Sequence, residues 1–429
     1  MVQRANKRCV SKITGSVWQM KICFFSENYY KGGLDTFLIN LFNAWPDPKD
    51  DLTLVCNSSH TGLETISAKT VRPITIKKYA YWFTSKIAQG QSSLKFSRSF
   101  LVRAFFVLGF RVLQYPVLLP WYLLLLTWFF CRSNFDRLMV VNGGYPASLI
   151  CRCAVIAWKL AGRRPLATFN FHNLATKPPW YFSFPENCID RAVINASARI
   201  ISVSKVCLDT LSNRKAYLGC TKLHFIHNGI EDPMLFLAGG EGNIKNINLS
   251  DKYCLMLATY EARKGYVYLL QAFKNVIKEF SNVRLQIFGF GKPKEKQLIA
   301  KEIKRFALEN HVSLHDFTHQ SASLIVNASV LVAPSQAYES FGLTIIEAMA
   351  LGTPVVVTDV GGMPEVLAGS DAGYVCSKDD PEAFADALKR ILGNKALASE
   401  LGLNGRRSFG QRFTASKMAC QYEAIIKQP

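Results

Sequence analysis

The sequence predicts an α/β protein built from two Rossmann-like domains that face each other across a cleft. Short apolar segments alternate with segments of helical periodicity along nearly the whole chain. This alternation is typical of parallel sheets covered by helices. It falls into two series of similar size that meet near Lys222. In such sheets the ligand sites lie at the carboxyl ends of the strands, so the loops after the strands are the candidate sites.

The first series, over residues 20–222, is predicted to form an N-terminal domain. Its strands are short apolar runs that end in polar or glycine residues. They are Met20–Phe25, Leu52–Cys56, Arg137–Asn142, Pro165–Phe171 and Ala198–Val203. Helical spacing follows over Leu34–Phe42 and Ala147–Leu160.

The second series, over residues 223–405, is predicted to form a C-terminal domain. Its predicted strands are Leu223–Ile226, Tyr253–Ala258, Arg284–Phe288, Val312–His315, Val330–Ala333 and Pro354–Thr358. Helices such as Val267–Phe280 and Pro293–Asn310 separate them. Leu237–Asp251 is rich in glycine and asparagine and is predicted as a loop. Residues 406–429 are predicted as a C-terminal helix that can return to the N-terminal domain.

The formal charge of +20 permits nucleic-acid, membrane or anionic-substrate binding. The basic residues are spread along the chain and no nucleic-acid-binding signature is present, so we expect no nucleic-acid partner. The twelve cysteines lack metal-ligand or redox spacing, which predicts reduced thiols and no metal site. Residues 1–19 are polar and basic and lack the apolar core of a signal peptide. Either this leader is disordered or Met20 is the true start.

An apolar insertion of about residues 100–131 interrupts the first series. Val112–Cys131 carries no charge over twenty residues, a length that could span a bilayer. Pro116 and Pro120 interrupt the run, and it falls between two strands of one domain. We therefore favour a helix at the membrane interface, with Trp121 and Trp128 at headgroup level. A buried core helix and a true span are the alternatives.

The stretch from Pro334 to Gly352 carries the strongest chemical signal. A strand ends at Ala333, a polar turn follows, and a helix begins near Leu343 and ends at Gly352, a favourable C-cap. The backbone N–H groups from Phe341 to Thr344 then lie at a helix N-terminus. That end is electropositive and has unpaired donors, which suits a diphosphate.

Two glutamates accompany this helix N-terminus. Glu339 lies just before the helix and Glu347 lies inside it, among apolar neighbours that a solvated helix face would not have. A carboxylate can accept two hydroxyl hydrogen bonds, which suits a ribose or a sugar. The glycine turn Gly361-Gly362, followed by Pro364 and Glu365, opens the next helix and permits close approach of a phosphate or sugar.

Glu339 and Glu347, with Phe341-Gly342-Leu343 between them, resemble the E-x7-E motif of retaining glycosyltransferase family 4. The following residues 352–356 and 361–365 extend the resemblance, and weaker similarity reaches back to Met20. The resemblance implies the GT-B fold, with the donor in the C-terminal domain and the acceptor mainly in the N-terminal domain. It also implies transfer without a metal or another cofactor, and with retained anomeric configuration.

The resemblance assigns roles residue by residue. Glu339, His172 and Lys264 are the expected catalytic residues: His172 faces the sugar and Lys264 contacts the diphosphate. The family's arginine is replaced here by Ala258 or Thr259, and Arg263 is expected to substitute for it. The expected donor-binding residues are Gly32, Gly33, Arg263, Lys264, Gly289, Ser340, Phe341, Gly342, Leu343 and Glu347.

The predicted function is therefore a retaining glycosyltransferase that takes a nucleotide-diphosphate sugar as its donor substrate. The apolar insertion and basic surface predict a lipid-linked saccharide acceptor and peripheral attachment to the cytoplasmic face of the cell membrane. Synthesis of surface polysaccharide or lipopolysaccharide fits such an acceptor. The alternatives are a nucleotide-sugar epimerase on the same fold and a non-catalytic, membrane-bound scaffold.

Overall fold

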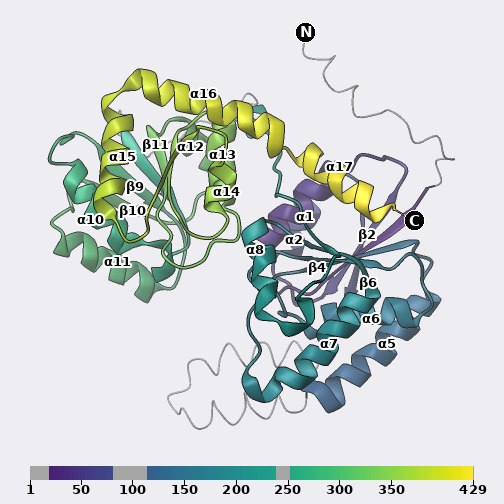
Figure 1. Cartoon of the computed structure of the whole chain (residues 1–429). Coiled ribbons are helices and arrows are strands. Elements are labelled where there is room, and N and C mark those ends of the chain that lie inside the picture. The colour runs from purple at the N-terminus through teal and green to yellow at the C-terminus, as the bar shows by residue number, and fades with distance from the viewer. Residues whose placement is uncertain (1–18, 81–113, 238–251, 429) are drawn as a thin grey trace.

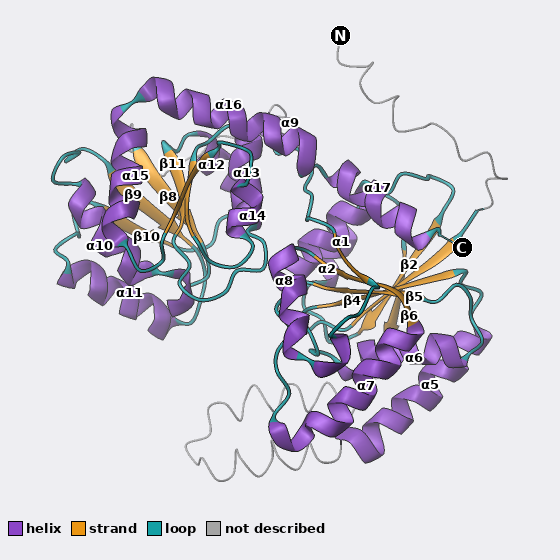
Figure 2. Ribbon diagram, viewed as in Figure 1, coloured by secondary structure: helices purple, strands orange, loops and turns teal. Residues whose placement is uncertain are grey.

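A computed structural model describes residues 19–80, 114–237 and 252–428. The predicted leader, the first part of the apolar insertion and the predicted loop Leu237–Asp251 lie almost entirely outside the described residues. Figures 1 and 2 show two separate α/β domains, joined along one side by the last two helices of the chain.

The N-terminal domain contains a seven-stranded parallel sheet in the order β3-β2-β1-β4-β5-β6-β7. Its strands are β1 Lys21–Ser26, β2 Asp51–Asn57, β3 Thr75–Tyr79, β4 Arg137–Asn142, β5 Ala167–Phe171, β6 Ser197–Ser202 and β7 Leu223–Phe225. The C-terminal domain contains a six-stranded parallel sheet in the order β10-β9-β8-β11-β12-β13. Its strands are β8 Tyr253–Leu257, β9 Arg284–Phe288, β10 Val312–His315, β11 Val330–Ala333, β12 Val355–Thr358 and β13 Gly373–Cys376.

One predicted domain boundary is wrong. Residues 223–225 were assigned to the start of the C-terminal domain, but β7 pairs with β6, with Ile200 opposite Leu223, at the edge of the N-terminal sheet. The N-terminal sheet therefore extends past residue 222. Strands β3 and β13, which form sheet edges, were not predicted.

The N-terminal sheet has helices on both faces because its strands alternate between two cores. Ile22 and Phe24 face the cluster under α1 and α17, whereas Cys23 and Phe25 face the cluster under α5 and α6. Burial on both faces explains the continuous apolar runs of these strands. The α-helices before the C-terminal domain are α1 Gly33–Asn43, α2 Leu63–Lys69, α5 Leu119–Arg132, α6 Leu149–Leu160, α7 Ser183–Ala196, α8 Lys205–Asp209 and α9 Met234–Leu237.

The C-terminal sheet is covered in the same way. One cluster joins Cys254 and Met256 to the helices α10 and α15, and the other joins Tyr253 and Leu255 to α13. The remaining α-helices are α10 Tyr266–Val276, α11 Pro293–Arg305, α12 Ser321–Val326, α13 Leu343–Leu351, α14 Met363–Leu367, α15 Pro381–Gly393, α16 Lys395–Arg412 and α17 Ala415–Ile426.

The chain returns to the N-terminal domain at its end, where α16 leads into α17 (Figure 1). Helix α17 packs on α1 and buries Tyr422 in the N-terminal core, where its hydroxyl accepts a bond from Asn170. The ammonium group of Lys427 lies 2.8 Å from Asp47, 2.7 Å from Asp50 and 3.0 Å from Glu423. Among the described residues, these three carboxylates are the one group close enough to share a metal, and the ammonium group of Lys427 already lies among them.

Helix α5 is the described part of the apolar insertion. A π-helical turn, Gln114–Leu118, leads into it, and together they have the length and composition of a membrane span. One face of the helix belongs to the N-terminal core, where Tyr122, Leu126 and Phe130 are buried. The opposite face is apolar and exposed. A helix with one face in the core and one in solvent differs from both a wholly buried core helix and an isolated span.

Candidate active site

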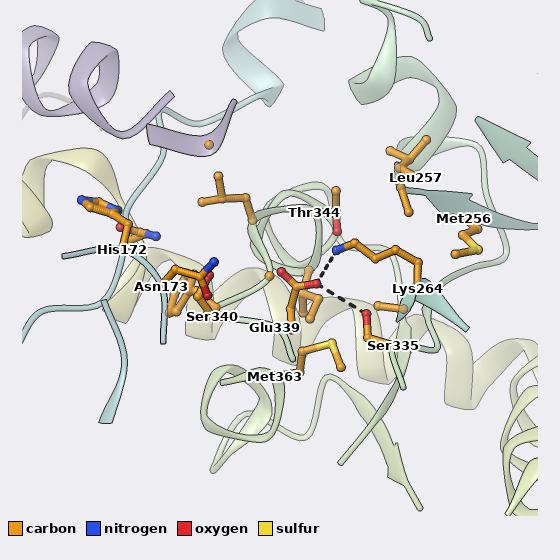
Figure 3. A pocket seen from close by; sticks show the side chains of 18 of the residues that line it. His172, Asn173, Met256, Leu257, Lys264, Ser335, Glu339, Ser340, Thr344 and Met363 are labelled. Atoms are coloured by element: carbon orange, nitrogen blue, oxygen red, sulfur yellow. Dashed lines mark hydrogen bonds and ion pairs between the residues drawn. The ribbon is translucent and has the colours of Figure 1, made fainter. Parts of the chain in front are cut away.

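A pocket of about 360 Å³ lies between the domains, at the carboxyl ends of strands from both sheets. The N-terminal domain lines it with the start of α1 and with residues after β4 and β5, among them Gly33, Gly143 and His172. The C-terminal domain lines it with Lys264, with parts of the loop after β11 and with the start of α13. Most of the predicted site residues therefore gather around one cavity (Figure 3).

The N-terminus of α13 forms one wall of the pocket. Gly342 is its N-cap with φ +97°, a left-handed conformation that favours glycine, and a Cβ there would have to displace Cδ1 of Ile345, which lies 2.6 Å away. The first turn of a helix leaves N–H groups unpaired and directs the positive end of the helix dipole outward. Because Leu343 and Thr344 both line the pocket, these donors can bind an anionic group inside it.

Lys264 and Glu339 form an ion pair across the pocket (Figure 3). The Lys264 side chain is 16% exposed and the Glu339 side chain is 18% exposed, so both are held mainly by the protein. The hydroxyl of Ser335 lies 3.4 Å from the same carboxylate oxygen. Lys264 is the only cation among the described residues that line the pocket. It is therefore the one side chain there that can neutralise a phosphate.

Arg263 and Gly289 do not line the pocket, in contrast to the prediction. Arg263 bonds Glu261 at 2.7 Å and the carbonyl oxygen of Tyr338 at 3.1 Å, and its guanidinium also lies 3.8 Å from the Glu339 carboxylate, so it contacts this carboxylate from outside the pocket lining. A Cβ on Gly289 would lie 1.9 Å from the carbonyl oxygen of Ala258, so this glycine allows close backbone packing. Ala258 itself lines the pocket and adds no charge there.

The loop that begins α1 contributes Gly33 to the pocket, but Gly32 lies outside it. Gly33 is within 3.6 Å of Leu343 across the cavity, measured from an ideal Cβ position. Asp35 fixes the loop, because its carboxylate accepts bonds from the Gly32 N–H at 3.0 Å and from His60 at 2.8 Å. Gly32 therefore positions the loop, and Gly33 is the glycine that faces the cavity.

His172 follows β5, where its N–H donates to the Asn142 carbonyl, and its side chain lies against the ring of Phe37. Burial lowers the pKa of the imidazole to about 3, so the ring is neutral at physiological pH. Its buried Nε2 has no hydrogen-bond partner among the described residues. Because His172 lines the pocket, that nitrogen can bond a hydroxyl group there.

Glu347 lies on α13 but is not part of the pocket wall. It follows Leu343 by four residues and Thr344 by three, so it lies one turn further along the same helix face. No hydrogen bond or ion pair of its carboxylate is present among the described residues. Burial raises the pKa of Glu347 from 4.5 to about 7. A desolvated carboxylate without a partner beside a pocket is a candidate binding group.

The turn Gly361-Gly362 supports the site from behind and does not line the pocket. The Gly362 N–H donates to the Glu339 carbonyl at 2.8 Å, and a Cβ on Gly361 would lie 1.9 Å from that oxygen. The hydroxyl of Ser204, from the N-terminal domain, donates to the Ser340 carbonyl at 2.7 Å. These contacts fix the loop that carries Glu339.

The structure also adds pocket residues that the sequence did not predict as site residues. They are Leu34, Gly143, Asn173, Asn228, Met256, Leu257, Ala258, Val332, Ala333, Pro334, Ser335, Ile345 and Met363. Thr344, which was predicted to lie at the helix N-terminus of the donor site, also lines the pocket. Some of these positions could have been predicted from sequence, because polar residues just after a strand, such as Asn173 after β5, are candidates for the pocket wall. Met256 and Val332 carried no signal, because buried strand residues look alike in sequence.

Residues 241–408 match the family model of glycosyl transferases group 1. The chain is 31% identical over 179 residues to N-acetyl-alpha-D-glucosaminyl L-malate synthase of Bacillus anthracis, covering 42% of this chain and 46% of the relative. It is 33% identical over 180 residues to phosphatidyl-myo-inositol mannosyltransferase of Mycobacterium leprae, covering 41% and 47%. It is 27% identical over 170 residues to the capsular polysaccharide biosynthesis glycosyltransferase CapM of Staphylococcus aureus, covering 38% and 44%. The chain thus spans less than half the length of these curated relatives.

Solved structures match nearly the whole chain. A glycosyltransferase from Rickettsia africae has a TM-score of 0.71 at 16% identity, covering 96% of this chain and 100% of that chain. The Anabaena HepE protein in complex with UDP and glucose has a TM-score of 0.68 at 16% identity, covering 96% and 100%. At this identity the likeness concerns the fold, and the predicted GT-B fold with two Rossmann-like domains is confirmed.

Proposed function

We propose that the protein is a retaining glycosyltransferase that transfers a sugar from a nucleotide-diphosphate sugar to a saccharide hydroxyl. The interdomain pocket carries this proposal, because the N-terminus of α13 and the ammonium group of Lys264 meet there with Gly33. Together they form a binding site for a diphosphate. The match to a glycosyl transferases group 1 domain supports the reaction class, and HepE with bound UDP and glucose supports the donor class.

In the proposed mechanism, the diphosphate replaces Glu339 as the partner of Lys264. The ammonium group and the α13 N-terminus then stabilise the negative charge that develops on the leaving group. Glu339, released from Lys264, accepts hydrogen bonds from sugar hydroxyls, and Glu347 accepts those of the ribose. The neutral His172 ring offers Nε2 to a further hydroxyl of the sugar.

The acceptor hydroxyl attacks the anomeric carbon from the face that the diphosphate leaves. A new C–O bond forms, the bond to the diphosphate oxygen breaks, and the hydroxyl proton moves to that oxygen. Electrostatic stabilisation by fixed groups supplies the rate enhancement, so the protein needs neither a carboxylate nucleophile nor a metal. Retention of configuration follows from this geometry.

The exposed face of α5 supports a membrane-bound acceptor. Trp121, Leu124 and Trp128 of α5, and Val117 in the helical turn before it, are between 53% and 71% exposed, and Arg132 lies over the Trp128 ring at 4.5 Å. Tryptophans on an apolar stripe beside basic residues suit the interface of an anionic membrane. We therefore place the enzyme on the cytoplasmic face of the membrane, where it acts on a lipid-linked saccharide of surface-polysaccharide synthesis. The lipid substrate in the name of the mycobacterial relative agrees with this.

The first test is the thermal stabilisation of the protein by UDP, GDP, ADP, CDP and TDP, with EDTA present. One nucleotide should raise the Tm of the wild type and of Glu400→Ala, an exposed control in the same domain. The same nucleotide should leave the Tm of Glu347→Ala unchanged. No shift of the wild type with any of the five would overturn the donor site.

Retention of the anomeric configuration is tested in a separate experiment. Slow hydrolysis of the donor serves as the reaction, since water then takes the place of the acceptor. Rapid proton NMR of the released sugar should show the anomer of the donor first. Initial release of the opposite anomer would contradict a retaining mechanism, and formation of an epimeric sugar would favour the epimerase alternative.

A non-catalytic scaffold is the second candidate, because Ala258 leaves Lys264 as the one cation on the described pocket wall. Nucleotide binding without donor hydrolysis or transfer to any membrane lipid would support it.

A further inference from the structure

A second cavity, of about 560 Å³, lies within the N-terminal domain and shares no lining residue with the interdomain pocket. Its walls come from the loops after β1, β4 and β5, and from the helical segment that begins at Gln114. It therefore opens at the carboxyl ends of the strands, the same end of the sheet that faces the donor pocket. Its volume is sufficient for a ligand of a few sugar units.

The polar floor of this cavity is held rigidly by ion pairs. Arg152 bonds both oxygens of Glu186, at 3.0 and 3.2 Å, and the Tyr115 hydroxyl donates to the same carboxylate at 2.8 Å. Arg214 bonds Glu186 and also Asp190. Burial opposes ionisation of Glu186, but the arginines outweigh it and lower the pKa of its carboxyl. These groups keep their positions before any ligand arrives.

Two groups in the floor remain available to a ligand. The Nε–H of Arg152 is buried and has no hydrogen-bond partner among the described residues. The Glu27 carboxyl accepts from the Ser148 hydroxyl and from the Tyr29 hydroxyl at 2.8 Å, and burial raises its pKa. A fixed donor and a carboxyl group inside one cavity match the alternating donors and acceptors of a saccharide.

The remaining wall is apolar and aromatic. Tyr115 and Phe182 lie with their ring centres 5.3 Å apart, beside Leu118 and the proline pair at 178–179. Apolar walls with a few fixed polar groups are typical of sites for sugar-sized ligands. The helical segment that lines the cavity continues directly into α5, and an exposed apolar stripe runs from Val117 in this segment to Trp121 in α5. A ligand in the cavity therefore lies next to the start of this apolar stripe.

We propose that this cavity binds the saccharide head of an amphipathic glycolipid, whose apolar tail lies along the exposed face of α5. The inference rests on the proposed transferase function, for which this ligand is the acceptor. It adds the location of the acceptor and its class: a glycolipid held at both its head and its tail, in contrast to a free sugar.

The test fills the cavity from two loops. Thr176→Trp places a large side chain in the cavity from the loop after β5 and keeps the backbone carbonyl that Arg214 bonds. Ala147→Trp places one there from the loop after β4. Thr221→Trp is the matched control, since it is exposed and lies at the opposite, amino end of the sheet, just before β7. The probe is n-octyl β-D-glucopyranoside below its critical micelle concentration, measured by calorimetry. Glucose and the sugar-free hexaethylene glycol monooctyl ether are the comparison ligands.

We expect the wild type and the control to bind octyl glucoside more tightly than either comparison ligand. Both filled variants should bind it at least tenfold more weakly while keeping the nucleotide-induced Tm shift of the wild type, which shows that they are folded. Equal binding by filled and control variants would place the probe on α5 alone and overturn the proposal. Equal affinity for the sugar-free ether, or absence of binding, would also overturn it.

The two proposals can fail separately. A nucleotide shift without cavity-dependent probe binding rejects the acceptor cavity and leaves the donor site intact. Cavity-dependent probe binding without any nucleotide shift retains a glycolipid site and rejects the transferase.

Discussion

Replacing Glu347 by glutamine should stabilise the fold and weaken nucleotide binding at the same time. The Glu347 side chain is half-buried beside the donor pocket and has no hydrogen-bond partner among the described residues, so its ionised form is poorly solvated. The pKa of Glu347 is about 7 in the folded chain, compared with 4.5 for a glutamate in the unfolded chain. Because each pH unit corresponds to 1.36 kcal/mol, ionised Glu347 costs the folded state about 3 kcal/mol above pH 7.

The sign of the pH dependence follows from linkage. Between pH 4.5 and 7 the folded chain holds a proton on Glu347 that the unfolded chain has released. The contribution of this group to stability therefore falls as pH rises through that window. The glutamine variant lacks this loss. Its advantage should be near zero at pH 4.5 and reach about 3 kcal/mol at pH 8.

Urea unfolding at pH 5 and pH 8 measures this difference. All seven tryptophans lie before residue 181, so tryptophan fluorescence follows the N-terminal domain and far-UV circular dichroism follows both domains. The stabilisation should therefore appear in the circular dichroism transition. Glu400→Gln, an exposed control, should unfold like the wild type at both pH values.

The nucleotide affinity of the glutamine variant should fall, although its stability rises. An amide offers one acceptor oxygen where a carboxylate offers two, so one ribose hydroxyl loses its partner and nucleotide affinity should fall about tenfold to a hundredfold. Equal stability of wild type and variant at pH 8, or unchanged nucleotide affinity in the variant, would refute the reasoning.

Three further outcomes follow from the structure. Gly342→Ala should cost about 2 kcal/mol of stability and remove the nucleotide-induced Tm shift. Gly352→Ala is the control, because Gly352 lies at the other end of the helix with φ +72° and has no close contacts. This control should cost about 1 kcal/mol and keep the Tm shift. Lys264→Ala should weaken nucleoside diphosphate binding at least tenfold in calorimetry and leave nucleoside binding unchanged, while Lys395→Ala, an exposed control, should change neither. Lys427→Met should cost about 2–3 kcal/mol in urea unfolding, because three carboxylates lose their shared partner.

The fold was predictable where strands are buried on both faces. The strands β4, β9 and β11 have the predicted bounds, because apolar runs between polar turns mark such strands clearly. The edge strand β10 also has the predicted bounds, although most of its residues are only half-buried. The edge strand β3 was missed since its residues are half-buried or exposed and include two lysines. Strand β7 was found but assigned to the wrong sheet. Its three residues carry no information about which of two sheets they join, and pairing with β6 decides it.

The candidate site was predictable to the extent that local motifs determine it. The position of Glu339 before a helix and of His172 after a strand follows from local sequence, and both line the pocket. The direction of the Arg263 side chain does not follow from local sequence, because it depends on bonds to Glu261 and to the carbonyl oxygen of Tyr338, 75 residues away. The second cavity was not predicted at all, since its floor joins side chains from α6 and α7 to the end of β1.

The contact between the domains explains why the glycines and the glutamate of the motif after β12 belong to the site, although of this motif only Met363 lines the pocket. Glu365 accepts from the backbone N–H groups of Lys205 at 2.8 Å and Val206 at 2.6 Å, in the N-terminal domain. The loop that carries Glu339 bonds the same region through Ser204. Because one short loop holds the candidate carboxylate on one side and the partner domain on the other, a change in domain orientation must move Glu339. The glycines and the glutamate of this motif therefore act on the pocket by fixing its geometry, while the residues that face the ligand come from the preceding loop and helix.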